Sequence, residues 1–153
     1  MTVIRAFSHV GVCVSDLERS LAFYRDALGF RERTRLEVAG EVPETLLGLH
    51  PVDLQAVFLE RDGVRVELLH YGSPGHRGSG APRPMNALGL THLSLAVADL
   101  DGALDALERA GAHVLRATRV HNPELGAQAI FVTDPDGTRI ELVQSGTGLL
   151  SSS

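Results

Sequence analysis

The chain contains no lysine, because all 14 of its basic residues are arginine. This absence excludes Schiff-base chemistry on a lysine amine, a phosphate-binding P-loop lysine and a Ser-Lys catalytic dyad. Cysteine is almost as scarce, since Cys13 is the only one. One cysteine cannot form a disulfide within its own chain, and we therefore expect a cytoplasmic protein in a reducing compartment.

Long apolar runs and clusters of basic residues are also missing. No run approaches the roughly 20 apolar residues of a membrane-spanning helix, and residues 1–5 lack the layout of a signal peptide. With a formal net charge of -5, we expect neither nucleic acid nor a membrane as a partner. The remaining composition, 44% hydrophobic and 22% charged, is that of an ordinary globular protein.

The most informative feature is an internal repeat. Residues 8–17 match residues 91–100 at a constant offset of 83. Each copy begins with alternating aliphatic residues, which predict a strand, and continues through an Asp-Leu pair into a helical pattern. In the first copy, Ser15 and Glu18 have the spacing of a capping box at the start of that helix.

The two copies also match at their ends. Residues 58–69 parallel residues 131–143, and in both a turn signal (Asp-Gly or Asp-Pro-Asp-Gly) separates two apolar runs. The order β-α-β-β-β is therefore predicted twice, over about residues 5–71 and 89–145. We predict a single domain over residues 1–150, with residues 72–88, rich in Gly and Pro, as a linker and residues 37–53 as an irregular segment.

Strand alternation selects four residues as one candidate site. His9 shares a strand face with Gly11, and His92 shares one with Ser94, while aliphatic residues occupy the opposite faces. Glu67 and Glu141 repeat this arrangement on the last strand of each copy. Two imidazoles and two carboxylates suit a divalent metal such as Zn, Ni, Co or Mn, or Fe(II), with positions left for water or a substrate.

At these residues the sequence resembles the vicinal oxygen chelate superfamily, which includes glyoxalase I, methylmalonyl-CoA epimerase, extradiol dioxygenases and bleomycin-resistance proteins. The motifs that carry the resemblance are His9-Val10-Gly11-Val12, Asp16-Leu17, Phe23-Tyr24, Leu28-Gly29-Phe30, His92, Asp134-Pro135-Asp136-Gly137 and Ile140-Glu141-Leu142. The resemblance implies an α+β fold in which two βαβββ modules pair into a half-open mixed β-barrel. It also implies a divalent ion with His9, Glu67, His92 and Glu141 as ligands.

Within this superfamily the pattern is nearest to glyoxalase I and the epimerase. Their shared reaction, removal of a proton next to a carbonyl of a small metabolite, implies Glu141 as the base and Glu67 as the opposing acid or base. The alternatives are an Fe(II) extradiol-type dioxygenase, which uses two His and one Glu, and a non-catalytic small-molecule-binding or resistance protein. We also expect a homodimer, because the exposed edges of an open barrel favour association.

Overall fold

The structure, a computed structural model, describes residues 2–146. It divides into two compact units, Met1–Arg77 and Gly78–Ser153, and each is described by itself. The boundary between them falls within the predicted linker, residues 72–88. Residue 1 and residues 147–150 of the predicted single domain lie outside the described residues, and the single-domain organisation stays a prediction.

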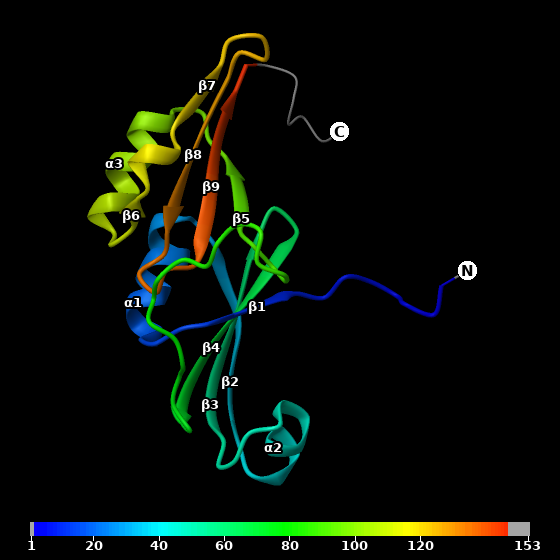
Figure 1. Ribbon diagram of the computed structural model, residues 1–153. Helices are drawn as coiled ribbons and strands as arrows, with labels where there is room; N and C mark the ends of the chain where they lie inside the picture. Colours follow the sequence, from blue (N-terminus) through cyan, green and yellow to red (C-terminus); the bar gives the residue numbers. More distant parts are fainter. Residues whose placement is uncertain (1, 147–153) are drawn as a thin grey trace. The chain divides into compact units, whose positions relative to one another are not determined.

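The first unit is built on a four-stranded mixed sheet in the order β1-β4-β3-β2. Strand β1 (Val10–Cys13) runs parallel to β4 (Val64–Ser73), and β3 (Asp53–Arg61) is antiparallel to both β4 and β2 (Arg31–Ala39). A helix, α1 (Leu17–Leu21), continues as one π-helical segment, η1 (Ala22–Ala27), between β1 and β2 (Figure 1).

One face of this sheet is a closely packed core. Val57 and Leu59 of β3 and Val66 and Leu68 of β4 are completely buried, as is Tyr24 of η1. Each pair is two residues apart in its strand, so all four strand side chains point to one face, and α1 contacts that sheet through β4. The opposite face of β4 is therefore the one that carries Glu67.

The cap of the first helix differs from the sequence-based prediction. Asp16, not Ser15, is the N-cap: its carboxylate accepts a hydrogen bond of 3.0 Å from the backbone N–H of Arg19. Ser15 instead accepts from the Arg19 guanidinium at 2.8 Å. Since an aspartate satisfies an unpaired helix N–H and also faces the positive end of the helix dipole, it is the better cap of the two.

The segment 37–53, predicted to be irregular, contains further structure. Strand β2 extends to Ala39, and a second helix, α2 (Glu41–Leu47), follows. Pro43 lies in the first turn of α2. Backbone N–H groups there have no hydrogen-bond acceptor within the helix, so the missing N–H of proline removes no hydrogen bond. Gly48 ends the helix in the left-handed conformation and donates its N–H to Glu44 at 2.9 Å. The prediction of an irregular segment was therefore wrong, because a proline in the first turn does not prevent a helix.

The second unit repeats the plan with a five-stranded sheet. Its path is β5-β9-β8-β6, and β7 also pairs with β8. The elements are β5 (Leu93–Ala96), α3 (Leu100–Arg109), β6 (His113–Val114), a 3-10 turn η2 (Arg116–Thr118), β7 (Val120–Asn122), β8 (Ala127–Thr133) and β9 (Arg139–Ser145). Strands β5 and β9 are parallel, as β1 and β4 are in the first unit. Leu100, Leu104 and Leu107 of α3 are buried, together with Ile140 and Leu142 of β9.

The turn between β8 and β9 is held by a buried carboxylate. Asp134 is completely buried, and its Oδ1 accepts hydrogen bonds from the backbone N–H groups of Asp136 at 2.9 Å and Thr138 at 2.8 Å. Gly137 lies at φ 89°, a conformation that only glycine adopts readily. The shorter matching turn of the first unit, Asp62-Gly63, has both residues at positive φ.

The predicted fold class is confirmed. The first unit has the order of a βαβββ module with α2 added, and the second has that order with one extra strand, because both β6 and β7 precede β8 and β9. The class is α+β, and each sheet is open and mixed. Among residues 2–146, no helix has the length and apolar character needed to cross a membrane.

Candidate metal centre

In the first unit, His9 and Glu67 lie against each other. His9 is the residue directly before β1, and Glu67 is on β4, where its Cα partner is Gly11. The parallel pairing of first and last strands thus brings together residues 58 positions apart in the sequence. The Nε2 atom of His9 is 3.1 Å from Oε2 of Glu67, and their side chains are 33% and 17% exposed.

The second unit repeats this pair. His92 directly precedes β5, and Glu141 is on β9, where its Cα partner is Ser94. The Nε2 atom of His92 is 3.7 Å from Oε2 of Glu141, with side chains 29% and 30% exposed. Each unit therefore presents one imidazole and one carboxylate, partly exposed and close together, at the same place in its sheet.

A hydroxyl group accompanies each histidine. Ser8 Oγ lies 2.8 Å from Nδ1 of His9, and Thr91 Oγ1 lies 2.8 Å from Nδ1 of His92. When Nδ1 donates its proton to such an oxygen, Nε2 keeps its lone pair and is available to a metal. In that tautomer, the Nε2 atoms that face the carboxylates are the ones that can bind a metal.

A phenylalanine packs on each histidine ring. Phe58 of β3 meets His9 edge-to-face with ring centroids 5.1 Å apart, and Phe131 of β8 meets His92 in the same way at 5.3 Å. Each phenylalanine is the antiparallel partner of the glutamate, Phe58 opposite Glu67 and Phe131 opposite Glu141. Sequence reasoning aligned these two phenylalanines as ends of the repeat but did not assign them to the site.

The two halves differ at one matched position. Ser94 donates a hydrogen bond of 2.9 Å to Oε2 of Glu141. The corresponding residue of the first unit is Gly11, where an added Cβ would lie 4.0 Å from Oε2 of Glu67 and 3.3 Å from a methyl group of Leu69. The Glu141 carboxylate thus accepts a hydrogen bond from Ser94, whereas the matching residue beside Glu67 is a glycine without a side-chain donor.

The donor atoms of the first unit have the spacing of two ligands of one divalent ion. Two ligands that are each about 2.1 Å from a metal, at an angle between 90° and 110°, are roughly 3.0–3.4 Å apart. The Nε2–Oε2 distance is 3.1 Å in the first unit and somewhat wider, 3.7 Å, in the second. Among residues 2–146, no group of three or more His, Cys, Asp or Glu side chains suited to a metal is found. Each unit therefore presents two candidate donors, one imidazole and one carboxylate.

Comparison with known proteins identifies the family. Residues 6–142 match the Glyoxalase/Bleomycin resistance protein/Dioxygenase superfamily. The chain belongs to this superfamily. The membership predicted from the histidine, glutamate and turn motifs is therefore confirmed, and the chain is a glyoxalase-superfamily protein.

Relatives of this glyoxalase-superfamily protein include named enzymes. It is 33% identical over 151 residues to a lactoylglutathione lyase from Salmonella typhimurium, covering 92% of this chain and 96% of the relative. It is 30% identical over 147 residues to an ethylmalonyl-CoA/methylmalonyl-CoA epimerase from Cereibacter sphaeroides, covering 93% and 99%. The superfamily thus includes lyases and epimerases at this level of similarity. Among solved structures, a glyoxalase family protein from Bacillus cereus has the same fold, with a TM-score of 0.80, 20% identity and coverage of 95% and 98%.

Proposed function

We propose that this protein is a divalent-metal-dependent lyase or isomerase that removes a proton next to a carbonyl group of a small metabolite. The observation that carries the proposal is the duplicated His–Glu pair, present at equivalent register positions in both units with matching hydroxyl and phenyl neighbours. One such pair could be an ordinary surface contact. Duplication of all four contributing groups favours a ligand set.

The proposed ligands are His9 and Glu67 from the first unit and His92 and Glu141 from the second. Two nitrogen and two carboxylate donors suit Zn, Ni, Co or Mn, with Fe(II) as the ion of the dioxygenase alternative. A bound ion would supply Lewis acidity, which stabilises negative charge on a substrate oxygen next to the reacting carbon. Two anionic ligands favour this acid–base role over oxygen activation.

The glutamates are the proposed acid–base groups. Glu141 is assigned as the base that takes the proton from carbon, and Glu67 as the group on the opposing side. The hydrogen bond from Ser94 restrains Oε2 of Glu141, the oxygen that also faces His92, so the carboxylate is held in position before a substrate binds. The rings of Phe58 and Phe131 pack edge-to-face against the histidine rings, which helps to hold the imidazoles in position.

The proposed chemistry is tested by proton exchange. Purified protein is loaded separately with Zn, Ni, Co, Mn or Fe(II) and incubated in D₂O with methylmalonyl-CoA or with the adduct of glutathione and methylglyoxal, probes chosen from the named relatives. In the wild type, we expect ¹H NMR to show that the carbon-bound proton exchanges with deuterium only when metal is present. In the Glu141→Gln variant, we expect this exchange to be abolished. Full exchange in the Glu141→Gln variant would refute the assignment of the base. Oxygen consumption with a catechol, restricted to the Fe(II) form, would support the dioxygenase instead.

We also propose that the protein is a cytoplasmic homodimer. The support for a dimer is an apolar N-terminal arm: Val3, Ile4 and Phe7 are 102%, 75% and 80% exposed. Apolar side chains gathered on a surface favour association, and β1, at the edge of its sheet, follows this arm directly. Sedimentation velocity should give a dimer mass for the wild type. A triple substitution of these three residues by serine should shift the mass to that of a monomer, and an unchanged mass would exclude the arm from the interface.

A further inference from the structure

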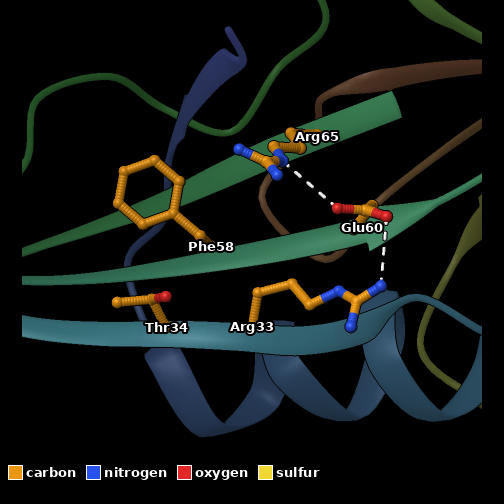
Figure 2. A pocket seen from close by; sticks show the side chains of 5 residues that line it. All are labelled: Arg33, Thr34, Phe58, Glu60 and Arg65. Atoms are coloured by element: carbon orange, nitrogen blue, oxygen red, sulfur yellow. Dashed lines mark hydrogen bonds and ion pairs between the residues drawn. The ribbon is translucent and has the colours of Figure 1, made fainter. Parts of the chain in front are cut away.

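A pocket of about 540 Å³ opens on the sheet of the first unit, lined by Arg33, Thr34, Phe58, Glu60 and Arg65. Figure 2 shows these side chains gathered over β2, β3 and β4. The two arginines come from opposite sides, one on β2 and one on β4, and the glutamate lies on β3 between them. The pocket therefore combines two guanidinium groups and one carboxylate with an aromatic ring.

Glu60 orients both arginines. Its Oε1 accepts a hydrogen bond of 3.1 Å from Arg33, and its Oε2 accepts one of 3.2 Å from Nε of Arg65. These two hydrogen bonds lower the pKa of Glu60, and the one from Arg65 has the larger effect. The carboxylate therefore stays ionised. One negative charge offsets only one of the two guanidinium groups. Each guanidinium has five N–H donors, and its contact with Glu60 leaves donors available in the pocket.

The positive charge continues into a second, adjoining pocket. It is lined by Gly29, Arg31, Arg33, Glu60, Arg61 and Asp62, and so shares Arg33 and Glu60 with the first. Across both pockets four arginines face two carboxylates, although the chain has a net charge of -5. The fold thus concentrates positive charge on a face of an otherwise acidic protein.

The basic pocket lies next to the His9–Glu67 pair, and Phe58 links the two. Phe58 lines the pocket and also packs against the ring of His9 at 5.1 Å. Arg65 and Glu67 are two residues apart on β4, so both point to the same face of the sheet, with Cα atoms about 7 Å apart. A ligand that occupies the pocket therefore lies beside the proposed metal ligands.

A β-bulge places Arg33 in the pocket. Glu32 pairs with Leu59 and Thr34 with the adjacent Phe58, so Arg33 is the inserted residue. In a regular strand two consecutive residues face opposite sides, yet Arg33 and Thr34 both line this pocket. Bulges redirect side chains in this way near functional sites.

From these features we infer an oxyanion subsite: Arg33 and Arg65 bind a carboxylate or phosphate group of the substrate. This inference rests on the proposed function and specifies the substrate class. The substrate would carry its anionic group roughly 7–12 Å from the reacting carbonyl, given the spacing of alternate strand residues and the length of an arginine side chain. Phe58 would pack against the part of the molecule between the two ends. Planar guanidinium groups suit both anions because they donate in pairs.

The test uses the full-length protein and two simple probes, inorganic phosphate and malonate, followed by ¹H–¹⁵N NMR of the arginine Nε–H groups. We expect saturable shifts of Arg33 and Arg65, and an increase of about tenfold in the dissociation constant for Arg33→Gln or Arg65→Gln. The matched control is Arg35→Gln. Arg35 is on the same strand but pairs with Glu32 and Glu18, and we expect its substitution to change binding less than twofold.

Each outcome decides the inference. Tighter binding of one probe assigns the subsite to phosphate or to carboxylate. Wild-type affinity in both pocket variants would overturn the subsite. An equal loss of affinity in Arg35→Gln would also overturn it, because the loss would then follow from the change in net charge and not from the position of the arginine. Metal content is measured in parallel and should be unchanged by the pocket substitutions. A protein that binds the anions but no metal would refute the proposed function while leaving the pocket, so the two failures are distinguishable.

Discussion

Removal of the hydroxyl groups beside the histidines should weaken metal binding without removing a ligand. The substitutions are Ser8→Ala and Thr91→Ala, each of which deletes a contact of 2.8 Å to a histidine Nδ1. Without the hydroxyl, the imidazole can turn or take the tautomer that carries its proton on Nε2. That tautomer cannot ligate, so some of the binding free energy is used to restore the correct form.

The size of the effect follows from exposure. Loss of a group that orients a metal-bound histidine typically lowers metal affinity about 10–100-fold, which corresponds to roughly 1.4–2.8 kcal/mol. Ser8 is exposed, so water can replace its hydroxyl, and we expect about tenfold for Ser8→Ala. Thr91 is partly buried, where replacement by water is less complete, and we expect a larger loss, between about 10-fold and 100-fold.

Two measurements separate this effect from general damage. Competition with a fluorescent chelator gives the metal affinity, and ¹⁵N NMR of the imidazoles in the metal-free protein reports which nitrogen carries the proton. Ser8→Thr and Thr91→Ser keep the hydroxyl and should retain both the affinity and the tautomer. Two results would contradict the proposal that the hydroxyls hold the metal-binding tautomer. One is an alanine variant that binds metal as tightly as the wild type, and the other is a wild type whose histidines carry their protons on Nε2.

Three further predictions concern the same elements. Asp134→Ala leaves two partly buried backbone N–H groups without their acceptor; we expect a loss of about 1–3 kcal/mol in the free energy of unfolding, measured by urea denaturation. Ser94→Ala removes the donor to Glu141 and should slow proton exchange about tenfold while metal content stays constant, which ¹H NMR in D₂O and metal analysis check together. Arg65→Gln removes the largest contribution to the lowered pKa of Glu60, so that pKa should rise in a ¹³C-carboxyl NMR titration. A carboxylate whose pKa is lower in the folded state stabilises the fold at pH values above its unfolded-state pKa. This stabilisation is lost as the pH falls through the folded-state pKa, so the variant should lose less stability on acidification than the wild type does.

The repeated elements could be predicted because their signals are local. Alternating aliphatic residues before Asp16 and Asp99 define the first strands, and turn residues define the last hairpins. Helix α2 was missed because a proline in a first helical turn is tolerated, which composition alone does not reveal. Ser8 and Thr91 were visible in the sequence, since a hydroxyl residue precedes the histidine in both copies, and the repeat could have indicated them.

The arginine pocket could not be predicted in the same way. Arg33 and Arg65 are separated by 32 positions, and no run of basic residues marks them. They meet because β2, β3 and β4 pair in a particular register and a bulge adds one residue at Arg33. Register between distant strands depends on the packing of the whole sheet, so the sequence indicated an acidic protein without a basic surface.

Metal analysis of purified and reconstituted protein tests the central claim most directly. The wild type, dialysed against Zn, Ni, Co, Mn or Fe(II), should retain one ion per chain, and both His9→Ala and His92→Ala should lose it because each removes one ligand of the same set. A wild type that retains none of these metals, or two histidine variants that keep a full ion per chain, would contradict the claim that the duplicated His–Glu pairs form a metal site.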